Sequence, residues 1–372
     1  MKHWRNFDFQ LIGIPTGLVA FSIFVLFAIS RWPIAGVPHS TPYRQGLYAL
    51  MGLAAMFLLT NFDYRLLRSV AVSVYFMILG VLAVILVIGH SAYGAQRWIN
   101  LGVLPLQPSE PAKLALVLVL AKFFADREGR LAQPSIVLRS LLFVAVPVGL
   151  VLMQPDLGTS AVFVAIWLGI ALMAGVRLSH LAALGVILLA ALPGIWIMLG
   201  HLKRFHYTQQ RLLIFMNPQQ DPLGAGYNVI HSQITVGSGG FLGQWFRIGT
   251  QSQLGLLRVE DKDFIFSVIA EQVGFIGVLI LFAVFVTLLM RIARVSFMAG
   301  DTYGRLLASG ILGMLMFQIF VNIGMNIGLM PVTGIPLPLI SYGGSSLITT
   351  LASFGILQSI LLRHQRLVFG TG

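Results

Sequence analysis

The segment Glu260–Phe266, with the sequence Glu-Asp-Lys-Asp-Phe-Ile-Phe, places three carboxylates directly before an apolar run. The last acid, Asp263, stands where a polar loop meets a segment apolar enough to enter a membrane. A carboxylate partly removed from water has a raised pKa, and if it reaches a polar substrate it can accept a proton as a general base. An aspartate that only caps the following helix would occupy the same place. Asp263 is therefore a candidate catalytic base, with helix capping as the competing interpretation.

Other acids have simpler interpretations. Glu110 and Lys113 open another apolar run three residues apart, on one helical face, so we favour a structural ion pair. Asp156 directly precedes a run that begins at residue 157 and suits the position of a helix N-cap. Glu271 would lie about 12 Å deeper than Asp263 at 1.5 Å per residue. We expect Glu271 to be a buried hydrogen-bonding group and not the base.

The polar stretch 201–263 is rich in cations. Lysine and arginine bind phosphate oxygens and stabilise a departing polyanion. Each cation alone could equally extend toward lipid headgroups. Together they predict an anionic substrate. They are Lys203, Arg204, Arg211, Arg247, Arg258 and Lys262.

Several other signals carry little information. The segment Gly237–Gly243 is similar to a nucleotide-binding fingerprint but lacks the surrounding strand and helix, so we interpret it as a flexible or close-packed turn. The sequence has no cysteine, which excludes disulfides and thiolate chemistry. Its eight histidines lack ligand spacing, and no metal site is predicted.

The composition identifies the class of protein that must position these groups. Hydrophobic residues make up 57% of the chain and charged residues only 10%, against about 25% charged in soluble domains. At roughly 20 residues per span, the apolar runs predict an all-α polytopic membrane protein with ten transmembrane helices in a single domain, 1–372. The runs lie near 11–30, 45–60, 69–89, 109–125, 136–154, 157–175, 180–200, 264–290, 306–327 and 345–362.

The net charge of +12 is explained by orientation and does not require nucleic acid as a partner. If the amino terminus is cytoplasmic, 14 of the 24 Lys and Arg residues fall on the cytoplasmic side, nearly all in short loops or tails. Because such residues collect in cytoplasmic loops, both termini are predicted to be cytoplasmic. The stretch 201–263 is then a large extracytoplasmic loop.

Two segments lack a spanning pattern. Unstructured loops beyond about 12–15 residues are uncommon, and 201–263 is too aromatic for a flexible linker, so we expect it to be folded on the outer face. The segment Met330–Ser346 contains three prolines and three glycines and cannot be an uninterrupted helix. Non-helical backbone at membrane depth occurs only against protein or a water-filled cavity. A surface turn and a cavity wall both remain open for this segment.

Several motifs in fixed order resemble the SEDS family (shape, elongation, division and sporulation proteins) over nearly the whole chain. The segment Gly249–Leu254 is more similar to the elongation-type branch than to the division-type branch. The motifs are Gly94–Ile99, Gln107–Lys113, Gln154–Ser160, Asp221–Tyr227, Gly249–Leu254, Asp263–Phe266 and Pro331–Ser346.

This resemblance implies a peptidoglycan glycosyltransferase of the bacterial cytoplasmic (inner) membrane that polymerises lipid II into β-1,4 glycan strands at the outer face during elongation and shape maintenance. It implies a class B penicillin-binding protein as transpeptidase partner, together with other elongation-complex proteins. Asp263 matches the family's essential aspartate. As the base, it would drive an inverting displacement of undecaprenyl diphosphate, which needs no cofactor and is compatible with a divalent cation. The residues expected to bind substrate are Arg97, Arg204, Arg211, Lys113, Glu110, Asp156 and Ser341.

Family members usually carry Pro-Glu-x-His-Thr before this aspartate, whereas Arg258–Lys262 stands here. Lys262 would lower the pKa of Asp263 and Asp261 would raise it. The alternative function is a lipid II flippase, which moves the precursor without forming a bond. A base belongs on the outer side near the loop cations, whereas a carboxylate that couples transport would lie nearer the midplane of the bilayer, as Glu271 does in this interpretation.

Overall fold

A computed structural model describes residues 7–31, 37–88, 90–92, 95–100, 105–201, 206–224, 226–245, 252, 257 and 261–363. Each predicted apolar run falls on a long helix. Of these helices, α1, α3, α5, α6, α11, α12 and α13 are long and apolar enough to cross a membrane. The all-helical architecture of an integral membrane protein is therefore confirmed, while the total of ten spans stays a prediction. The helices are α1 (Phe9–Ser30), α2 (Thr41–Asn61), α3 (Tyr64–Ile88), α4 (Ser109–Ala125), α5 (Pro134–Leu152), α6 (Leu157–Ala174), α7 (Leu178–His201), α11 (Ile265–Met298), α12 (Thr302–Asn326) and α13 (Gly344–Leu362).

Shorter elements connect these helices. An antiparallel sheet of order β1-β2-β3, which the sequence did not predict, precedes α4; its strands are β1 (His90–Ala92), β2 (Ala95–Asn100) and β3 (Pro105–Leu106). The connection between α7 and α11 contains α8 (His206–Met216), the 3-10 turn η3 (Pro218–Gln220) and α9 (Tyr227–Ser238). The described part of this connection is therefore largely helical, while its place as a folded outer loop stays a prediction.

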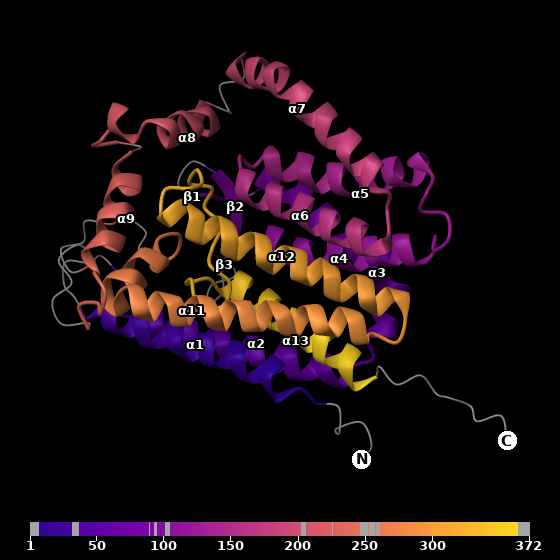
Figure 1. Ribbon diagram of the computed structural model, residues 1–372, viewed down its shortest axis with the longest axis horizontal. Coiled ribbons are helices and arrows are strands. Elements are labelled where there is room, and N and C mark those ends of the chain that lie inside the picture. The colour runs from indigo at the N-terminus through magenta and orange to yellow at the C-terminus, as the bar shows by residue number, and fades with distance from the viewer. Residues whose placement is uncertain are drawn as a thin grey trace.

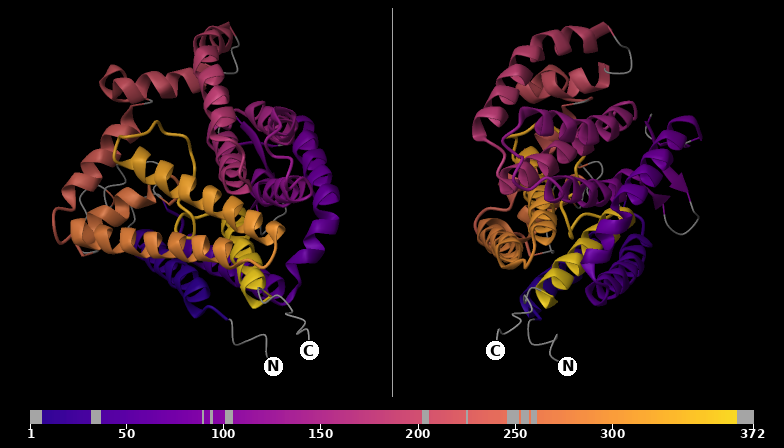
Figure 2. Two further views of the ribbon diagram at one scale, coloured as in Figure 1. Left: turned by 45° about the vertical axis from the view of Figure 1, so that its right-hand side comes forward. Right: turned by 90° about the vertical axis from the view of Figure 1, so that its right-hand side faces the viewer.

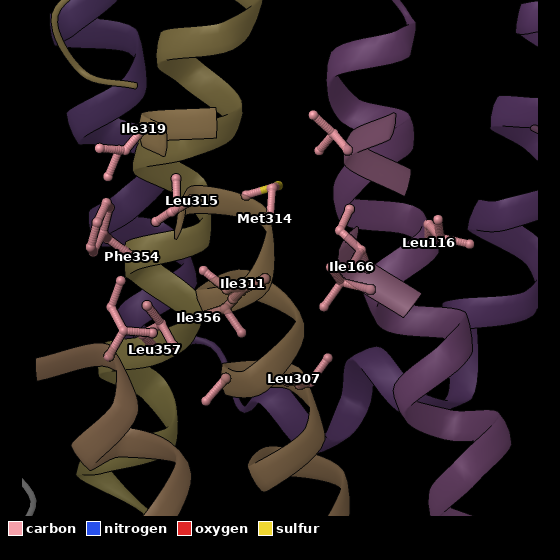
Figure 3. Packing of buried hydrophobic residues seen from close by; sticks show 14 of the residues in the cluster. Leu116, Ile166, Leu307, Ile311, Met314, Leu315, Ile319, Phe354, Ile356 and Leu357 are labelled. Atoms are coloured by element: carbon pink, nitrogen blue, oxygen red, sulfur yellow. The ribbon is translucent and has the colours of Figure 1, made fainter. Parts of the chain in front are cut away.

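Helix α12 lies at the centre of the bundle. Figure 3 shows its side chains, including Leu315, between Phe354 of α13 on one side and Ile166 of α6 on the other. The contact with α6 is close because it is made by small residues: a Cβ built on Gly313 would lie 3.0 Å from the carbonyl oxygen of Ala165. In contrast, α7 and α8 rise away from this compact group of helices (Figure 1, Figure 2).

Helix α11 is broken at Gly274, whose φ of 68° and ψ of −172° are not helical. The turn that follows α9 is hydrogen-bonded into this break, because the amide of Phe275 donates to the carbonyl oxygen of Gly240 and that of Trp245 to Gln272. A Cβ on Gly243 would collide with the carbonyl oxygen of Gln272. Of the two predicted alternatives for Gly237–Gly243, a flexible turn or a close-packed turn, the structure shows the close-packed turn.

Ion pairs gather at one end of the bundle, where α11 ends and α12 begins. Arg291 pairs with Asp8 at 3.5 Å and Arg305 with Glu128 at 3.7 Å. The end of α13 contributes Arg363, 3.7 Å from Asp63. Asp263 precedes the first residue of α11 and so lies at the opposite end of that helix. The orientation, with these arginines on the cytoplasmic side, stays a prediction.

Candidate active site

Asp263 lies in a turn directly before α11 and does not cap that helix. The N-cap position belongs to Phe264, and no side chain caps the helix there. Among the described residues no hydrogen bond is donated to the carboxylate of Asp263, and its side chain is partly exposed. The helix-capping interpretation is therefore wrong for this residue, and its carboxylate oxygens are available for other chemistry.

Arg211 and Gly334 form the surroundings of this carboxylate. A Cβ built on Gly334 would lie 3.6 Å from Oδ2 of Asp263 and 3.8 Å from Nη1 of Arg211, so both charged groups face the same glycine. Gly334 has a φ of 74°, which L side chains rarely adopt. A glycine here therefore permits the turn and leaves the space between acid and guanidinium open.

The segment that contains Gly334 forms one wall of a small cavity. Arg211 donates a hydrogen bond of 3.0 Å from Nη1 to the carbonyl oxygen of Val332. The cavity encloses about 20 Å³, about the room that one water molecule needs. Its lining combines the start of α6, helix α8 and the proline-rich segment, which supports the cavity-wall interpretation. It is lined by Pro155, Leu157, Arg211, Leu212, Pro331, Val332 and Thr333.

The electrostatic environment favours a proton acceptor at Asp263. Burial raises the pKa of its carboxyl group above the usual value of 3.8, while the charges of Arg211 and Lys262 act in the opposite direction and those of Asp261 and Asp156 add to the increase. Burial also raises the pKa of Asp261, with Lys262 opposing it. Asp263 differs from Asp261 in facing a guanidinium group across an open glycine.

Ser341 holds the proline-rich segment to the turn that carries Asp263. Its hydroxyl donates to the carbonyl oxygen of Lys262 at 2.6 Å and accepts from the amide of Leu337 at 2.8 Å. The amide of Tyr342 donates to the carbonyl oxygen of Asp261 at 2.8 Å. Ser341 is buried, so in this structure its hydroxyl joins two parts of the protein. Its predicted contact with substrate stays a prediction.

The other described site candidates already have partners within the protein. Glu110 and Lys113 form a buried ion pair of 2.6 Å. Asp156 caps α6 and accepts a hydrogen bond of 3.1 Å from the amide of Thr159. Arg97 lies on β2, where its side chain is outside the described part of the chain, and Arg204 is also outside it. Substrate contacts by all of these residues remain predictions.

Glu271 is buried, as expected, and is engaged by serines. Its Oε2 accepts from the hydroxyl of Ser252 at 2.5 Å and from the amide of Ser252 at 3.2 Å. Its Oε1 accepts from Ser238 at 3.4 Å. Among the described residues, no group of three or more His, Cys, Asp or Glu side chains could hold a metal ion.

Sequence reasoning missed two asparagines of α12 that contact the Asp263 turn. Asn322 and Asn326 are both 0% exposed, and both donate from Nδ2 to the carbonyl oxygen of Asp263. Their signal was available, because two carboxamides four residues apart inside an apolar span share one helical face and are costly to bury unpaired.

Comparison with known proteins agrees with this geometry. A family model described as "Cell cycle protein", covering FtsW, RodA and SpoVE, matches residues 9–366. The chain belongs to this family. It is 38% identical over 345 residues to the peptidoglycan glycosyltransferase MrdB of Escherichia coli K12, with 92% of this chain and 91% of that protein covered. The SEDS resemblance read from the motifs is confirmed.

Two solved structures share the fold. The chain is 35% identical to a structure described as "Structural coordination of polymerization and crosslinking by a peptidoglycan synthase complex", with a TM-score of 0.82 and coverage of 97% of this chain and 99% of that chain. The crystal structure of the rod shape determining protein RodA of Thermus thermophilus has a TM-score of 0.70 and 32% identity, with 96% of each chain covered. Both similarities span the whole bundle described above.

Proposed function

We propose that this protein is a peptidoglycan glycosyltransferase that polymerises lipid II, and that Asp263 is its general base. The observation that carries the proposal is that a partly buried carboxylate, which accepts no hydrogen bond among the described residues, and a guanidinium group both face Gly334. The name of the MrdB relative supports the same reaction class.

In the proposed reaction, Asp263 takes the proton from the 4-hydroxyl of the acceptor N-acetylglucosamine. The oxygen forms a bond to the anomeric carbon of the donor N-acetylmuramic acid, and the bond from that carbon to undecaprenyl diphosphate breaks with its electron pair. An α-linked diphosphate becomes a β-1,4 linkage, so one displacement inverts the anomeric centre. Diphosphate leaves as a stabilised anion, and the reaction needs one base and cationic stabilisation but no acid for a sugar leaving group.

Arg211 is the described cation best placed to stabilise the leaving diphosphate. Its hydrogen bond to the carbonyl oxygen of Val332 fixes one side of the guanidinium group, and its position beside Gly334 brings the positive charge toward Asp263. Guanidinium groups bind phosphate oxygens in a fixed geometry. We propose Arg97 and Arg204 as further contacts to the diphosphate or the sugars, with the buried pair Glu110–Lys113, Asp156 and Ser341 as more distant members of the site.

Family membership supports the rest of the proposal, which concerns topology, location and partner. The arginines at one end of α11 and Asp263 at the other support the proposed orientation. We propose that both termini are cytoplasmic, that 201–263 lies outside the cytoplasmic membrane, and that ten helices span it as one domain. A class B penicillin-binding protein is the proposed partner, in cell-wall elongation, and similarity to a synthase complex that coordinates polymerization and crosslinking supports such coupling. The flippase alternative is less favoured, because Glu271 is bonded by serines, whereas the carboxylate of Asp263 accepts no hydrogen bond among the described residues.

The test is polymerisation of lipid II by the purified protein in complex with its class B penicillin-binding protein, with glycan strands resolved by electrophoresis. Removing a general base is expected to slow the reaction about 10²–10⁴-fold, so Asp263→Asn should lose nearly all polymer. Asp261→Asn, two residues away in the same turn, is the matched control and should keep activity. A folded wild-type complex that makes no polymer, while the E. coli relative does so alongside, would overturn the proposal. If Asp263→Asn and Asp261→Asn both moved fluorescent lipid II across the membrane of reconstituted vesicles, that result would favour the flippase.

A further inference from the structure

The turn that carries Asp263 is held by two carboxamides of the central helix. The carbonyl oxygen of Asp263 accepts from Nδ2 of Asn322 at 3.2 Å and from Nδ2 of Asn326 at 3.0 Å. Residues four apart project from one face of a helix, so α12 presents both donors to the same oxygen. Both lone pairs of this carbonyl are thereby used, and the backbone of Asp263 is fixed to the helix at the centre of the bundle.

Asn326 also joins the Asp263 turn to the first turn of α11. The amide of Ser267 donates to the carbonyl oxygen of Phe264 at 3.0 Å and to Oδ1 of Asn326 at 3.3 Å, and the hydroxyl of Ser267 donates to the same Oδ1 at 2.6 Å. The carboxamide of Asn326 therefore bridges Ser267 and the carbonyl oxygen of Asp263. Asp263 is kept in the turn, where its side chain faces Gly334.

Asn322 extends the same connection to the opposite wall. Its Nδ2 donates to the carbonyl oxygen of Ile335 at 2.7 Å, one residue beyond Gly334. One amide group therefore joins the backbone of the acid to the backbone of the wall that the acid faces. Because the bonds are made to main-chain atoms on both sides, they set the separation of the two segments independently of their side chains.

The stability of the bundle alone does not explain Asn322. It is 0% exposed, and among the described residues its Oδ1 has no hydrogen-bond partner. A buried acceptor without a partner costs folding free energy, and an apolar residue of similar shape would avoid that cost. The two donated hydrogen bonds are the feature that an apolar residue could not supply.

We propose that Asn322 and Asn326 are positioning residues, which hold Asp263 against Gly334 and Arg211 for proton abstraction. This inference rests on the proposed function of Asp263. Displacement of a reacting group by about 1 Å can cost a factor of about 10² in rate. Loss of either carboxamide should therefore reduce kcat about 10–100-fold and leave KM nearly unchanged, since neither asparagine contacts substrate in this scheme.

The first experiment compares Asn322→Leu and Asn326→Leu with Gln318→Leu in the lipid II polymerisation assay, with the partner transpeptidase present. Gln318 is the matched control, because it is a buried carboxamide one turn earlier on α12 and makes no described contact with the Asp263 turn. Asn322→Ser is measured in parallel in case the leucine variants fail to fold. A kcat equal to that of Gln318→Leu, or a loss confined to KM, would overturn the proposal.

The second experiment does not depend on activity. The chain has no cysteine, so Asp263→Cys provides a single thiol whose rate of labelling by a charged methanethiosulfonate reagent reports its position. Adding Asn322→Leu or Asn322→Ser should raise that rate about tenfold, and adding Gln318→Leu should not. An unchanged rate would refute the positioning role even if the wild-type enzyme polymerises lipid II. Conversely, a raised rate with an inactive wild type would count against the proposed function alone.

Discussion

The buried pair Glu110–Lys113 offers a sharp test of structural against substrate-binding roles. Nζ of Lys113 lies 2.6 Å from Oε2 of Glu110, with side-chain exposures of 3% and 4%. Removing one member leaves an uncompensated buried charge, which costs about 3–5 kcal/mol, whereas replacing both by uncharged groups of similar volume is often neutral or stabilising. We therefore expect Lys113→Met and Glu110→Gln to destabilise the protein separately and the double variant to recover most of the loss.

The measurement is thermal unfolding of the four proteins in one detergent, combined with steady-state polymerisation of lipid II. At an unfolding entropy of about 2.1 cal/mol/K per residue over 372 residues, a loss of 3–5 kcal/mol lowers the apparent Tm by roughly 4–6 °C. The coupling energy from the double-mutant cycle should be several kcal/mol, and the double variant should keep KM.

The opposite pattern would refute this reasoning. If Lys113 contacts the diphosphate of the substrate, Lys113→Met should raise KM strongly while the apparent Tm stays near that of the wild type, and Glu110→Gln should not rescue it. A double variant as unstable as the worse single variant would likewise contradict a simple ion pair. In that case Glu110 and Lys113 would each stabilise the protein by a contact other than their mutual neutralisation.

Three further predictions concern the acids and the arginine of the site. Because burial raises the pKa of Asp263, the proposed base becomes protonated at a higher pH than an ordinary aspartate. The pH profile of kcat/KM should therefore fall on its acidic side, with a midpoint above pH 3.8. Arg211→Met removes a charge that lowers this pKa, so it should shift the acidic midpoint of the profile to higher pH and also slow diphosphate departure. An unshifted midpoint would mean that Arg211 and Asp263 do not interact. Glu271→Gln should leave kcat within about threefold but lower the apparent Tm, because its partners Ser238 and Ser252 lose a charge-assisted acceptor; a loss as large as that of Asp263→Asn would identify Glu271 as part of the chemistry.

Much of this architecture could be predicted because single-residue properties determine it. Apolar runs long enough to span a membrane located the long helices, including the start of α11 next to Asp263. The position of Asp156 directly before an apolar run likewise predicted the cap that it makes on α6. The spacing of three residues predicted the pair Glu110–Lys113. These are local features, in which the sequence neighbour is also the spatial neighbour.

The break in α11 could not be predicted in this way. Gly274 lies within a long, mostly apolar run, and an isolated glycine is tolerated within a helix. Its non-helical conformation is stabilised by amides from a turn about 30 residues earlier, such as that of Trp245, which donates to the carbonyl oxygen of Gln272. The partners that make the break favourable are distant in sequence, so no local pattern reports it. The sheet before α4 was missed because an all-α composition left no reason to expect strands.

Three other acids of the candidate site are already engaged within the protein, which supports Asp263 as the proposed base. Glu110 is neutralised by a lysine, and Asp156 is occupied as a helix cap. Glu271 accepts hydrogen bonds from two serines. Among the described residues, the carboxylates of Asp261 and Asp263 accept no hydrogen bond from another residue, and of these two Asp263 faces a guanidinium group across a glycine that leaves the intervening space open. The proposed displacement of diphosphate needs one base and a nearby cation, and Asp263 with Arg211 is the described pair that meets this need.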